Sequence, residues 1–206
     1  MRVAQVARSF YPVKGGMELN VLQITCELVK RGYEVEVFTT TAFLSEEAPA
    51  EEEMEGFIVH RFKVKARMAG YFYAPGLLEA LKRFKPDVIH VHFHAGHHAY
   101  SAFKAKRHLG VPMILTPYAF YHSRERRVLK LMYDFLIGRR VLKGADAVTI
   151  FTEYEKELCV RKGVEEGRLY IVPEGVDDKI FNPSVDADTV RKKLGLEGRV
   201  VTFVGR

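Results

Sequence analysis

The sequence has few cysteines, no tryptophan and no long hydrophobic run. Cys26 and Cys159 are the only cysteines among the 206 residues. Two cysteines cannot form the disulfide framework of a small secreted domain, and no segment has the roughly 18 consecutive apolar residues that a membrane-spanning helix needs. The N-terminus also lacks the basic and then apolar segments of a signal peptide. We therefore expect a cytoplasmic protein.

Several short motifs are also missing, and each absence argues against a class of function. The first turn, Val13–Glu18, lacks the G-x-G-x-x-G of a nicotinamide-binding domain, and the next strand ends in threonines instead of an acid. There is no G-x-x-x-x-G-K-[ST] phosphate loop and no G-x-S-x-G nucleophile elbow. The net charge is +6, but no helix-turn-helix, zinc-finger spacing or aromatic-basic repeat supports binding to nucleic acid.

A glycine turn near the N-terminus is the feature around which the chain is arranged. Val3–Ala7 is apolar enough for a buried strand, and apolar residues recur at helical spacing from Met17 onward. Gly15 and Gly16 lie between the two, at the predicted start of a helix. The first N–H groups of a helix lack partners, and glycine lets a ligand approach the backbone, so the turn suits a phosphate. A tight turn without a ligand is the alternative, and this stretch alone does not separate the two.

Strands and helices alternate along most of the chain. The pattern predicts about seven strands in a Rossmann-like, doubly wound parallel sheet, a fold of the α/β class. We expect this domain to span residues 1–177 and a polar linker to follow over 178–198. The pattern of residues 199–206 predicts a strand and a glycine turn with no helix after them. We interpret them as the first strand of a truncated second domain, and the chain as a fragment.

Ligands of such sheets bind at the carboxyl ends of the strands, so segments far apart in the sequence should meet there. These segments are Phe10–Gly16, His92–His98, Tyr118–His122, Phe151–Tyr154 and Glu174–Asp177.

Histidines are concentrated in one predicted strand and the turn after it. His90 and His92 alternate with apolar residues, and His94, His97 and His98 follow. No carboxylate or cysteine stands at ligand spacing from them, and strand histidines are commonly hydrogen-bonded core residues. We therefore predict no metal site, and place His92 and His94 on the floor of the ligand crevice.

Two charged segments also need an interpretation. Residues 45–56 hold six glutamates and no cation, and we expect a solvated loop there. The pattern of residues 124–143 predicts a long basic helix with an apolar stripe, which we expect to pack on the sheet. The alternative for this helix is peripheral contact with anionic lipid at the inner face of the cell membrane.

Six motifs, in order along the chain, resemble those of the family 4 retaining glycosyltransferases, which have the GT-B fold. They are Pro12–Glu18 (P-x-x-G-G-x-E), Arg31–Val35 (R-G-H-E-V), Lys85–His92 (K-P-D-V-I-H-x-H), Ala145–Val148 (A-D-A-V), Val172–Pro183 (I-P-N-G-V-D…F-x-P) and Phe203–Arg206 (F-V-G-R). One such motif is weakly specific, whereas six in register are strong support for a resemblance along the whole chain.

The resemblance implies one half of a GT-B fold, in an enzyme that transfers a hexose from a nucleotide-sugar to an acceptor with retention of configuration. The nucleotide-sugar is then a substrate, and neither a cofactor nor a metal is expected. The N-terminal domain would offer the acceptor side, and a missing C-terminal domain would hold most of the nucleotide. Lipid, glycan and small-molecule acceptors all fit. We expect residues 1–206 alone to fold but to be inactive.

The resemblance also implies site residues. The reaction needs donors for the departing diphosphate and a polar group near the anomeric carbon. The predicted substrate-binding residues are Gly15, Gly16, Glu18, Glu174, Gly175 and Asp177. Glu18 either contacts the ligand or only favours the helix N-terminus. The candidate catalytic residues, which the sequence does not rank, are His92, His94, Tyr118 and His122.

Three positions depart from the family pattern. Tyr118 stands where the family often has an active-site histidine, so the Tyr118 hydroxyl or His122 would have to replace it. Glu174 replaces an asparagine, and Tyr33 replaces a histidine that we regard as structural. The rival interpretation is a non-catalytic Rossmann-like module that captures an anion or another ligand such as a peptide.

Overall fold

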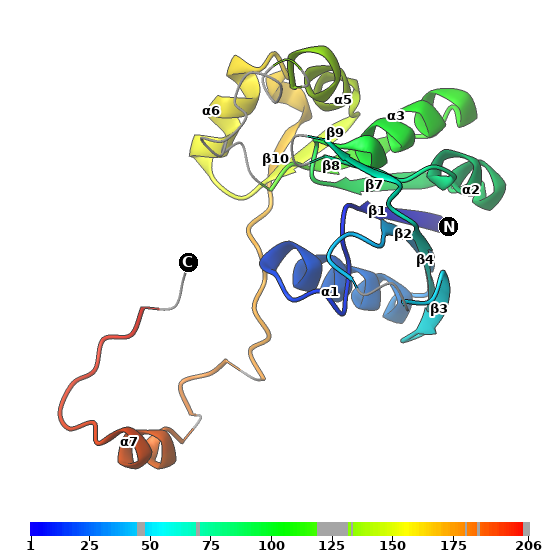
Figure 1. The fold of residues 1–206 in the computed structure, drawn as a ribbon. Helices are drawn as coiled ribbons and strands as arrows, with labels where there is room; N and C mark the ends of the chain where they lie inside the picture. The colour runs from blue at the N-terminus through cyan, green and yellow to red at the C-terminus, as the bar shows by residue number, and fades with distance from the viewer. Residues whose placement is uncertain are drawn as a thin grey trace. The chain divides into compact units, whose positions relative to one another are not determined.

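The computed structural model describes residues 1–44, 48–68, 71–118, 132, 134–179, 181–184 and 186–203. It divides into a larger unit, Met1–Pro173, and a smaller unit, Glu174–Arg206. The larger unit has one main sheet with helices on both faces (Figure 1). The predicted α/β class and its Rossmann-like arrangement are confirmed.

Eight strands form the main sheet in the order β10-β9-β8-β7-β1-β2-β4-β3, and all pairs are parallel except β3 with β4. Their bounds are β1 Arg2–Ala7, β2 Glu34–Thr40, β3 Glu51–Met54, β4 Phe57–Phe62, β7 Val88–His92, β8 Met113–Thr116, β9 Ala147–Ile150 and β10 Leu169–Ile171. A separate hairpin pairs β5 Ala66–Met68 with β6 Tyr71–Tyr73. The sequence pattern missed β3 and this hairpin, and for this reason it predicted fewer strands than the structure has.

Strand β3 lies in the acidic stretch for which the sequence suggested a solvated loop, and that prediction is wrong for Glu51–Met54. The glutamates have partners on the neighbouring strand. Glu52 Oε2 lies 2.7 Å from Arg61 Nη1, and Glu51 Oε2 lies 3.1 Å from His60 Nδ1. Such cross-strand pairs stabilise an antiparallel edge strand that acidic composition alone does not suggest. Residues 45–47 lie outside the described residues.

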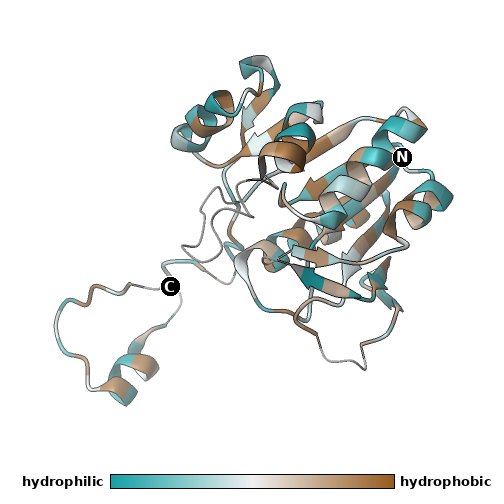
Figure 2. Ribbon diagram, turned by 45° about the horizontal axis from the view of Figure 1, so that its top comes forward, coloured by the Kyte–Doolittle hydropathy of each residue, from teal (hydrophilic) through white to brown (hydrophobic). Residues whose placement is uncertain are grey.

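Helices cover the sheet from two sides. The described helices are α1 Gly16–Lys30, α2 Leu77–Phe84, α3 His97–Leu109, α5 Arg139–Gly144, α6 Glu153–Arg161 and, in the smaller unit, α7 Asp188–Leu194. Along β1, Ala4 and Val6 join a hydrophobic cluster with α2 and α3, whereas Val3 and Ala7 join a second cluster with α1. This alternation is expected for a central strand that is buried on both faces. The helices themselves carry both hydrophobic and hydrophilic residues (Figure 2).

The helix predicted over residues 124–143 falls largely outside the described residues. Its described part begins with a π-helical turn, Asp134–Gly138, and continues as α5. A π turn contains one extra residue and therefore shifts the apolar stripe. Met132, Phe135 and Leu136 are exposed, while Ile137 packs against the core. The expectation that the apolar stripe packs on the sheet is therefore wrong for these three residues.

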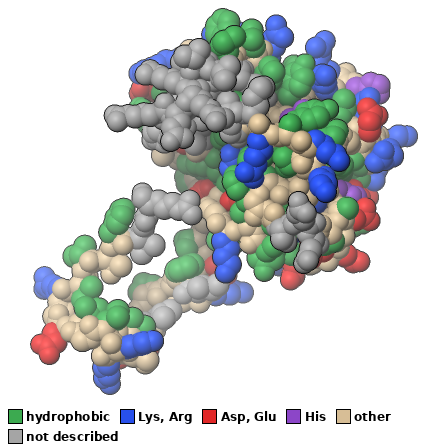
Figure 3. All heavy atoms as spheres, viewed as in Figure 1, with side chains coloured by type: hydrophobic (Ala, Val, Ile, Leu, Met, Phe, Trp, Pro, Cys, Tyr) green, Lys and Arg blue, Asp and Glu red, His purple; other side chains and the backbone are tan. Residues whose placement is uncertain are grey.

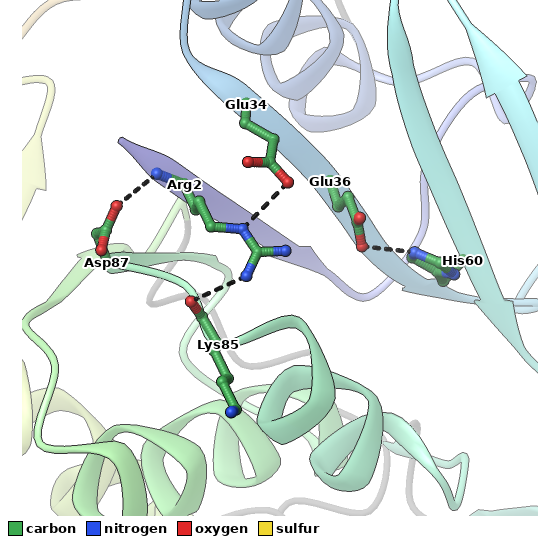
Figure 4. Close-up of polar contacts among 6 residues, drawn as sticks. All are labelled: Arg2, Glu34, Glu36, His60, Lys85 and Asp87. Carbon is green, nitrogen blue, oxygen red and sulfur yellow. Dashed lines mark hydrogen bonds and ion pairs between the residues drawn. The ribbon is translucent and has the colours of Figure 1, made fainter.

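Polar contacts tie the strands together away from the carboxyl edge (Figure 4). The Arg2 backbone N–H donates to Asp87 Oδ2 at 2.6 Å, and Arg2 Nε lies 3.0 Å from Glu34 Oε1. On the next strand pair, His60 Nε2 lies 2.7 Å from Glu36 Oε2. His60 therefore belongs to the pairing of β2 with β4 and not to the histidine cluster.

The smaller unit contains the predicted short helix, α7, which ends at Gly195 with a φ of 62°. Residues 199–203 form no strand, although the sequence predicts one over 199–206. A strand needs a neighbour with which to pair. The assignment of these residues to a second domain, and the boundaries at 177 and 198, stay predictions.

Gly144, the last residue of α5, packs against the ring of Phe103 on α3. A Cβ on Gly144 would lie 2.3 Å from Phe103 Cε2. We expect Gly144→Ala to lower the free energy of unfolding by about 1–3 kcal/mol, because the ring must move. Gly167→Ala is the control, since no heavy atom lies within 4 Å of a Cβ there. Urea unfolding measures both, and equal stability of the two variants would contradict the prediction.

Candidate functional site

Three parallel strands end side by side at the carboxyl edge of the sheet. Ala7 pairs with His92 and His92 pairs with Thr116, so the ends of β1, β7 and β8 are in register. The glycine loop follows β1, the histidine turn follows β7, and Tyr118 follows β8 (Figure 1). We call this place the carboxyl-edge site, comprising residues 8–16, 92–98 and 116–118. The structure thus brings the glycine loop, the histidine turn and Tyr118 to one edge, as the sequence predicted.

The glycine loop ends in a helix N-terminus that faces open space. Gly15 is the N-cap residue of α1, and both glycines are exposed. The first helical hydrogen bond runs from Leu19 N to Gly15 O at 3.0 Å. The N–H groups of Gly16, Met17 and Glu18 therefore have no acceptor within the helix. No heavy atom lies within 4 Å of a Cβ on Gly16, which leaves room for a ligand at this position.

Glu18 lies on the protein side of the same loop. Its side chain is buried, and its Oε1 accepts a hydrogen bond from Ser9 Oγ at 2.5 Å. A Cβ on Gly15 would lie 2.3 Å from Glu18 Oε2, although the Gly15 backbone is extended. Gly15 is thus required for the close approach of this carboxylate, which also favours the helix dipole. The geometry supports the structural role of Glu18, and direct ligand contact stays a prediction.

His92 links the core of the sheet to Tyr118. Its Nε2 lies 2.7 Å from Gln5 Oε1, and its Nδ1 lies 3.2 Å from the Tyr118 hydroxyl. Burial, aided by the nearby His90 and His98, holds the pKa of His92 well below its ordinary value. A neutral ring that donates from Nε2 to Gln5 has Nδ1 available to accept from Tyr118. His92 is therefore a weak base that holds Tyr118 in place.

His90 and His98 are also neutral, structural groups. His90 Nε2 lies 2.9 Å from Thr116 Oγ1, and burial lowers the pKa of His90 to about 4. His98 Nε2 lies 3.1 Å from the carbonyl oxygens of both His92 and Phe93, and burial lowers the pKa of His98 to about 3. His94 is likewise buried, so Tyr118 is the more exposed of these two candidates.

Left-handed backbone occurs just beyond three strand ends. Phe43 after β2 has a φ of 68°, Phe93 after β7 has 75°, and Tyr118 after β8 has 60°. Residues other than glycine adopt this conformation at a cost of roughly 1–3 kcal/mol each, and such strain is concentrated at functional sites. Glu55 and Lys85 are also left-handed but lie elsewhere, so this feature, which sequence reasoning did not anticipate, supports the carboxyl edge without singling it out.

Arg8 places a cation at the end of β1. Its guanidinium carbon lies 4.9 Å from the ring centroid of Phe93 and 5.4 Å from that of Phe43. Burial lowers the pKa of Arg8, while the charge of Glu18 opposes that shift. Its Nε has no hydrogen-bond partner in the described part of the chain. Sequence reasoning missed Arg8 and Gln5, although a polar residue in or directly after a buried strand was an available signal.

Four of the predicted site residues are not placed at this edge. His122 lies outside the described residues. Glu174, Gly175 and Asp177 belong to the smaller unit, so their approach to the carboxyl-edge site stays a prediction.

Across the described ranges, no three His, Cys, Asp or Glu side chains gather as metal ligands would. None of the described helices has the length and apolar character to span a membrane.

The family model for the glycosyl transferase 4-like domain matches residues 15–175. The chain belongs to this family. The match begins in the glycine loop and includes every described element of the larger unit that follows β1. The resemblance inferred from the six motifs is therefore confirmed.

Curated relatives of this glycosyl transferase 4-like chain are longer than it is. The D-inositol 3-phosphate glycosyltransferase of Rhodococcus opacus is 29% identical over 215 residues, which cover 93% of this chain and 47% of that protein. The protein of the same name from Stackebrandtia nassauensis is 29% identical over 232 residues, covering 100% of this chain and 52% of that protein. The chain spans about half the length of the curated relatives it matches.

Solved structures of low sequence identity share the fold of this glycosyl transferase 4-like chain. Anabaena HepE in complex with UDP gives a TM-score of 0.67 at 16% identity, covering 95% of this chain and 50% of HepE. The UDP-GlcNAc 2-epimerase of Methanocaldococcus jannaschii gives 0.53 at 14% identity, covering 84% and 45%. The predicted half of a GT-B fold is confirmed. Because an epimerase has it too, the fold alone does not define the reaction.

Proposed function

We propose that this chain is the acceptor-side domain of a glycosyltransferase of two domains. The full enzyme would transfer a sugar from a nucleotide-sugar to an acceptor hydroxyl, with retention of configuration. The observation that supports the proposal is the register of β1, β7 and β8, whose aligned ends bring the glycine loop, the histidine turn and Tyr118 to the same edge of the sheet. Membership of the glycosyl transferase 4-like family supports it.

In this proposal the glycine turn stabilises the leaving diphosphate. The first N–H groups of α1 have no acceptor within the helix, and a Cβ on Gly16 would meet no heavy atom within 4 Å. Negative charge grows on the diphosphate as the bond to the sugar breaks, and fixed backbone donors stabilise it without reorganisation. The second domain would hold most of the nucleotide.

Tyr118 would orient the acceptor hydroxyl. Its hydroxyl, which lies 3.2 Å from His92 Nδ1, would form a hydrogen bond with the acceptor hydroxyl. His92 would act as a positioning residue, because its low pKa makes it a poor proton acceptor. His94 stays a candidate for contact with the sugar.

A substrate screen of the longer protein tests this proposal. UDP-, GDP- and ADP-sugars are each offered with polyol, polyol phosphate, glycan and lipid acceptors, and the products are identified by mass and by anomeric configuration. HepE has been solved in complex with UDP and with UDP-glucose, and the curated relatives are named for D-inositol 3-phosphate, so we expect UDP-glucose and a polyol phosphate to be productive.

The 206-residue chain alone is the control, and we expect it to transfer no sugar. Binding of a donor by the longer protein without transfer to any acceptor would favour the rival binding module. Inversion at the anomeric carbon would overturn the retaining mechanism alone.

We also keep the cytoplasm as the proposed location, where the free Cys26 and Cys159 would stay reduced.

A further inference from the structure

Arg61, near the carboxyl end of β4, is the only buried lysine or arginine among the described residues. The other described Lys and Arg side chains of the larger unit are at least partly exposed, and several are visible in Figure 3. The Arg61 side chain is only 1% exposed, and its Nη1 lies 2.7 Å from Glu52 Oε2 on β3. A buried cation requires a partner of this kind, because an unpaired charge is strongly disfavoured away from water. Glu52 therefore accounts for one side of the guanidinium.

The other side of the guanidinium holds the glycine loop, residues 8–16. Arg61 Nη2 donates to the carbonyl oxygen of Tyr11 at 3.0 Å. A guanidinium is planar and its donors have fixed directions, so one side chain can hold a carboxylate and a carbonyl oxygen at the same time. Arg61 therefore links the border strand β3 to the loop that follows the central strand β1.

Stability alone does not account well for an arginine at this position. Phe57, Val59 and Arg61 are alternate residues of β4 and so lie on one face of the sheet. Phe57 and Val59 belong to the hydrophobic cluster that includes Phe10 and packs against α1. An apolar residue at position 61 would continue this face, and a buried ion pair is often no more stabilising than apolar side chains of similar volume. The contact with the loop is what an apolar residue cannot supply.

Two more carbonyl oxygens of the glycine loop are held by donors of the protein. Thr40 Oγ1 donates to Arg8 O at 2.6 Å, and Val13 N donates to Phe10 O at 3.1 Å. A carbonyl oxygen carries partial negative charge and would repel a diphosphate. Donors that hold these oxygens within the protein therefore favour an anion at the N–H groups that begin α1.

We infer that Arg61 is a positioning residue, which fixes the glycine loop so that the first N–H groups of α1 meet the leaving diphosphate. It acts through the loop and does not itself touch the substrate. This inference rests on the proposed function, because only there does the loop stabilise a diphosphate. It also gives the acidic strand β3 a role, since Glu52 balances the charge of the buried guanidinium.

Arg61→Met in the longer enzyme tests the inference by steady-state kinetics. Methionine keeps an unbranched apolar stem but removes both contacts. We expect kcat and kcat/KM for the productive donor to fall together by about 10- to 100-fold, because a displaced backbone donor loses stabilisation of the transition state. The KM for the acceptor should stay within about twofold.

Arg2→Met is the matched control for the loss of an arginine. Arg2 also contacts a carboxylate on a neighbouring strand, Glu34 at 3.0 Å, and a backbone carbonyl oxygen, that of Lys85 at 3.5 Å. It lies at the start of β1, at the opposite end of the strand from the glycine loop. Turnover by Arg2→Met should therefore stay near wild type.

A double-mutant cycle tests whether Arg61 acts through the glycine turn. In a Gly16→Val background, Arg61→Met should lower kcat/KM by less than about threefold more, because the same backbone donors are already blocked. A defect that arises elsewhere would multiply with the effect of Gly16→Val. Multiplying effects, or wild-type turnover in Arg61→Met alone, would overturn the inference.

Hydrogen exchange in the 206-residue chain measures the loop without any substrate. The Val13 N–H should exchange about tenfold faster in Arg61→Met relative to the amides of β1, which report overall opening. In Arg2→Met the loop and strand amides should change in parallel. A parallel change in Arg61→Met would overturn the inference. If Arg61→Met does not fold, Arg61→Lys keeps the charge opposite Glu52 but offers one nitrogen instead of two, and it should show the same change confined to the loop.

The two arms separate this inference from the proposed function. If the wild-type longer protein transfers no sugar, the proposed function fails, and hydrogen exchange still decides whether Arg61 holds the loop. Lost turnover in Gly16→Val beside wild-type turnover in Arg61→Met would overturn the inference alone.

Discussion

Gly16→Val in the longer enzyme should lower kcat/KM by about 100-fold or more, equivalent to about 2.7 kcal/mol of transition-state stabilisation. No heavy atom of the described protein lies within 4 Å of a Cβ at this position, so the valine meets only the ligand. It would hold the diphosphate away from the backbone N–H groups at the start of α1. Steady-state kinetics with the productive donor measures the effect.

The stability of the same variant is the necessary companion measurement. Gly16 is the first residue of α1 and its backbone is not left-handed, so valine should change the free energy of unfolding by less than about 1 kcal/mol. Gly167→Val, also in open space but in the turn before β10, should leave both kinetics and stability near wild type. Unchanged turnover in Gly16→Val would remove the glycine turn from the mechanism.

Acidification should destabilise the folded chain through its buried histidines. Burial lowers the pKa of His90 to about 4 and that of His98 to about 3, and it lowers the pKa of His92 well below its ordinary value. In the unfolded chain these rings titrate near pH 6.5, so below that pH the unfolded state binds more protons than the folded state. Stability is therefore fully present above about pH 6.5 and decreases as the pH falls toward 4.

The size of this effect is large relative to the stability of a domain. Each such histidine lowers the free energy of unfolding by about 1.4 kcal/mol per pH unit within its window. His90 and His98 together should account for a loss of about 3–4 kcal/mol between pH 7 and pH 5, and His92 acts in the same direction. A typical domain has only about 5–15 kcal/mol in total.

Urea unfolding at a series of pH values measures this dependence. His98→Gln retains a donor for the carbonyl oxygens of His92 and Phe93 but removes the titrating ring, so its stability should depend less steeply on pH than that of the wild type. His108→Gln, at an exposed position, is the matched control and should keep the wild-type slope. A wild-type slope in His98→Gln would show that this ring is already protonated in the fold.

The sequence predicted those elements that are long or apolar. The βα units built on β1, β7 and β8 follow from apolar runs and helical spacing, and parallel topology then places their ends at one edge. Strand β3 was missed because its glutamates are stabilised by cross-strand partners on β4, which no local pattern shows. The exposure of Phe135 and Leu136 was missed because apolar residues at helical spacing predict a buried stripe, and the local pattern shows no π turn.

The candidate site was predictable as a set of segments and not as a set of contacts. Gly16 and Tyr118 follow from motif and topology. The burial of His92 and its contact with Gln5 do not, because residues far apart in the sequence meet only in the folded sheet. The alternating cations of Arg61–Arg67 were visible in the sequence, but the pairing of Arg61 with Glu52 on the neighbouring strand required the structure.

The two margins of the main sheet differ from its centre in a way that bears on self-association. One border is β3, where Glu51, Glu52 and Glu53 give a dense negative charge, and the other is β10, which is only three residues long. Acidic or very short border strands resist the addition of a further strand and so protect against aggregation. We therefore expect the sheet to resist lengthening from either side.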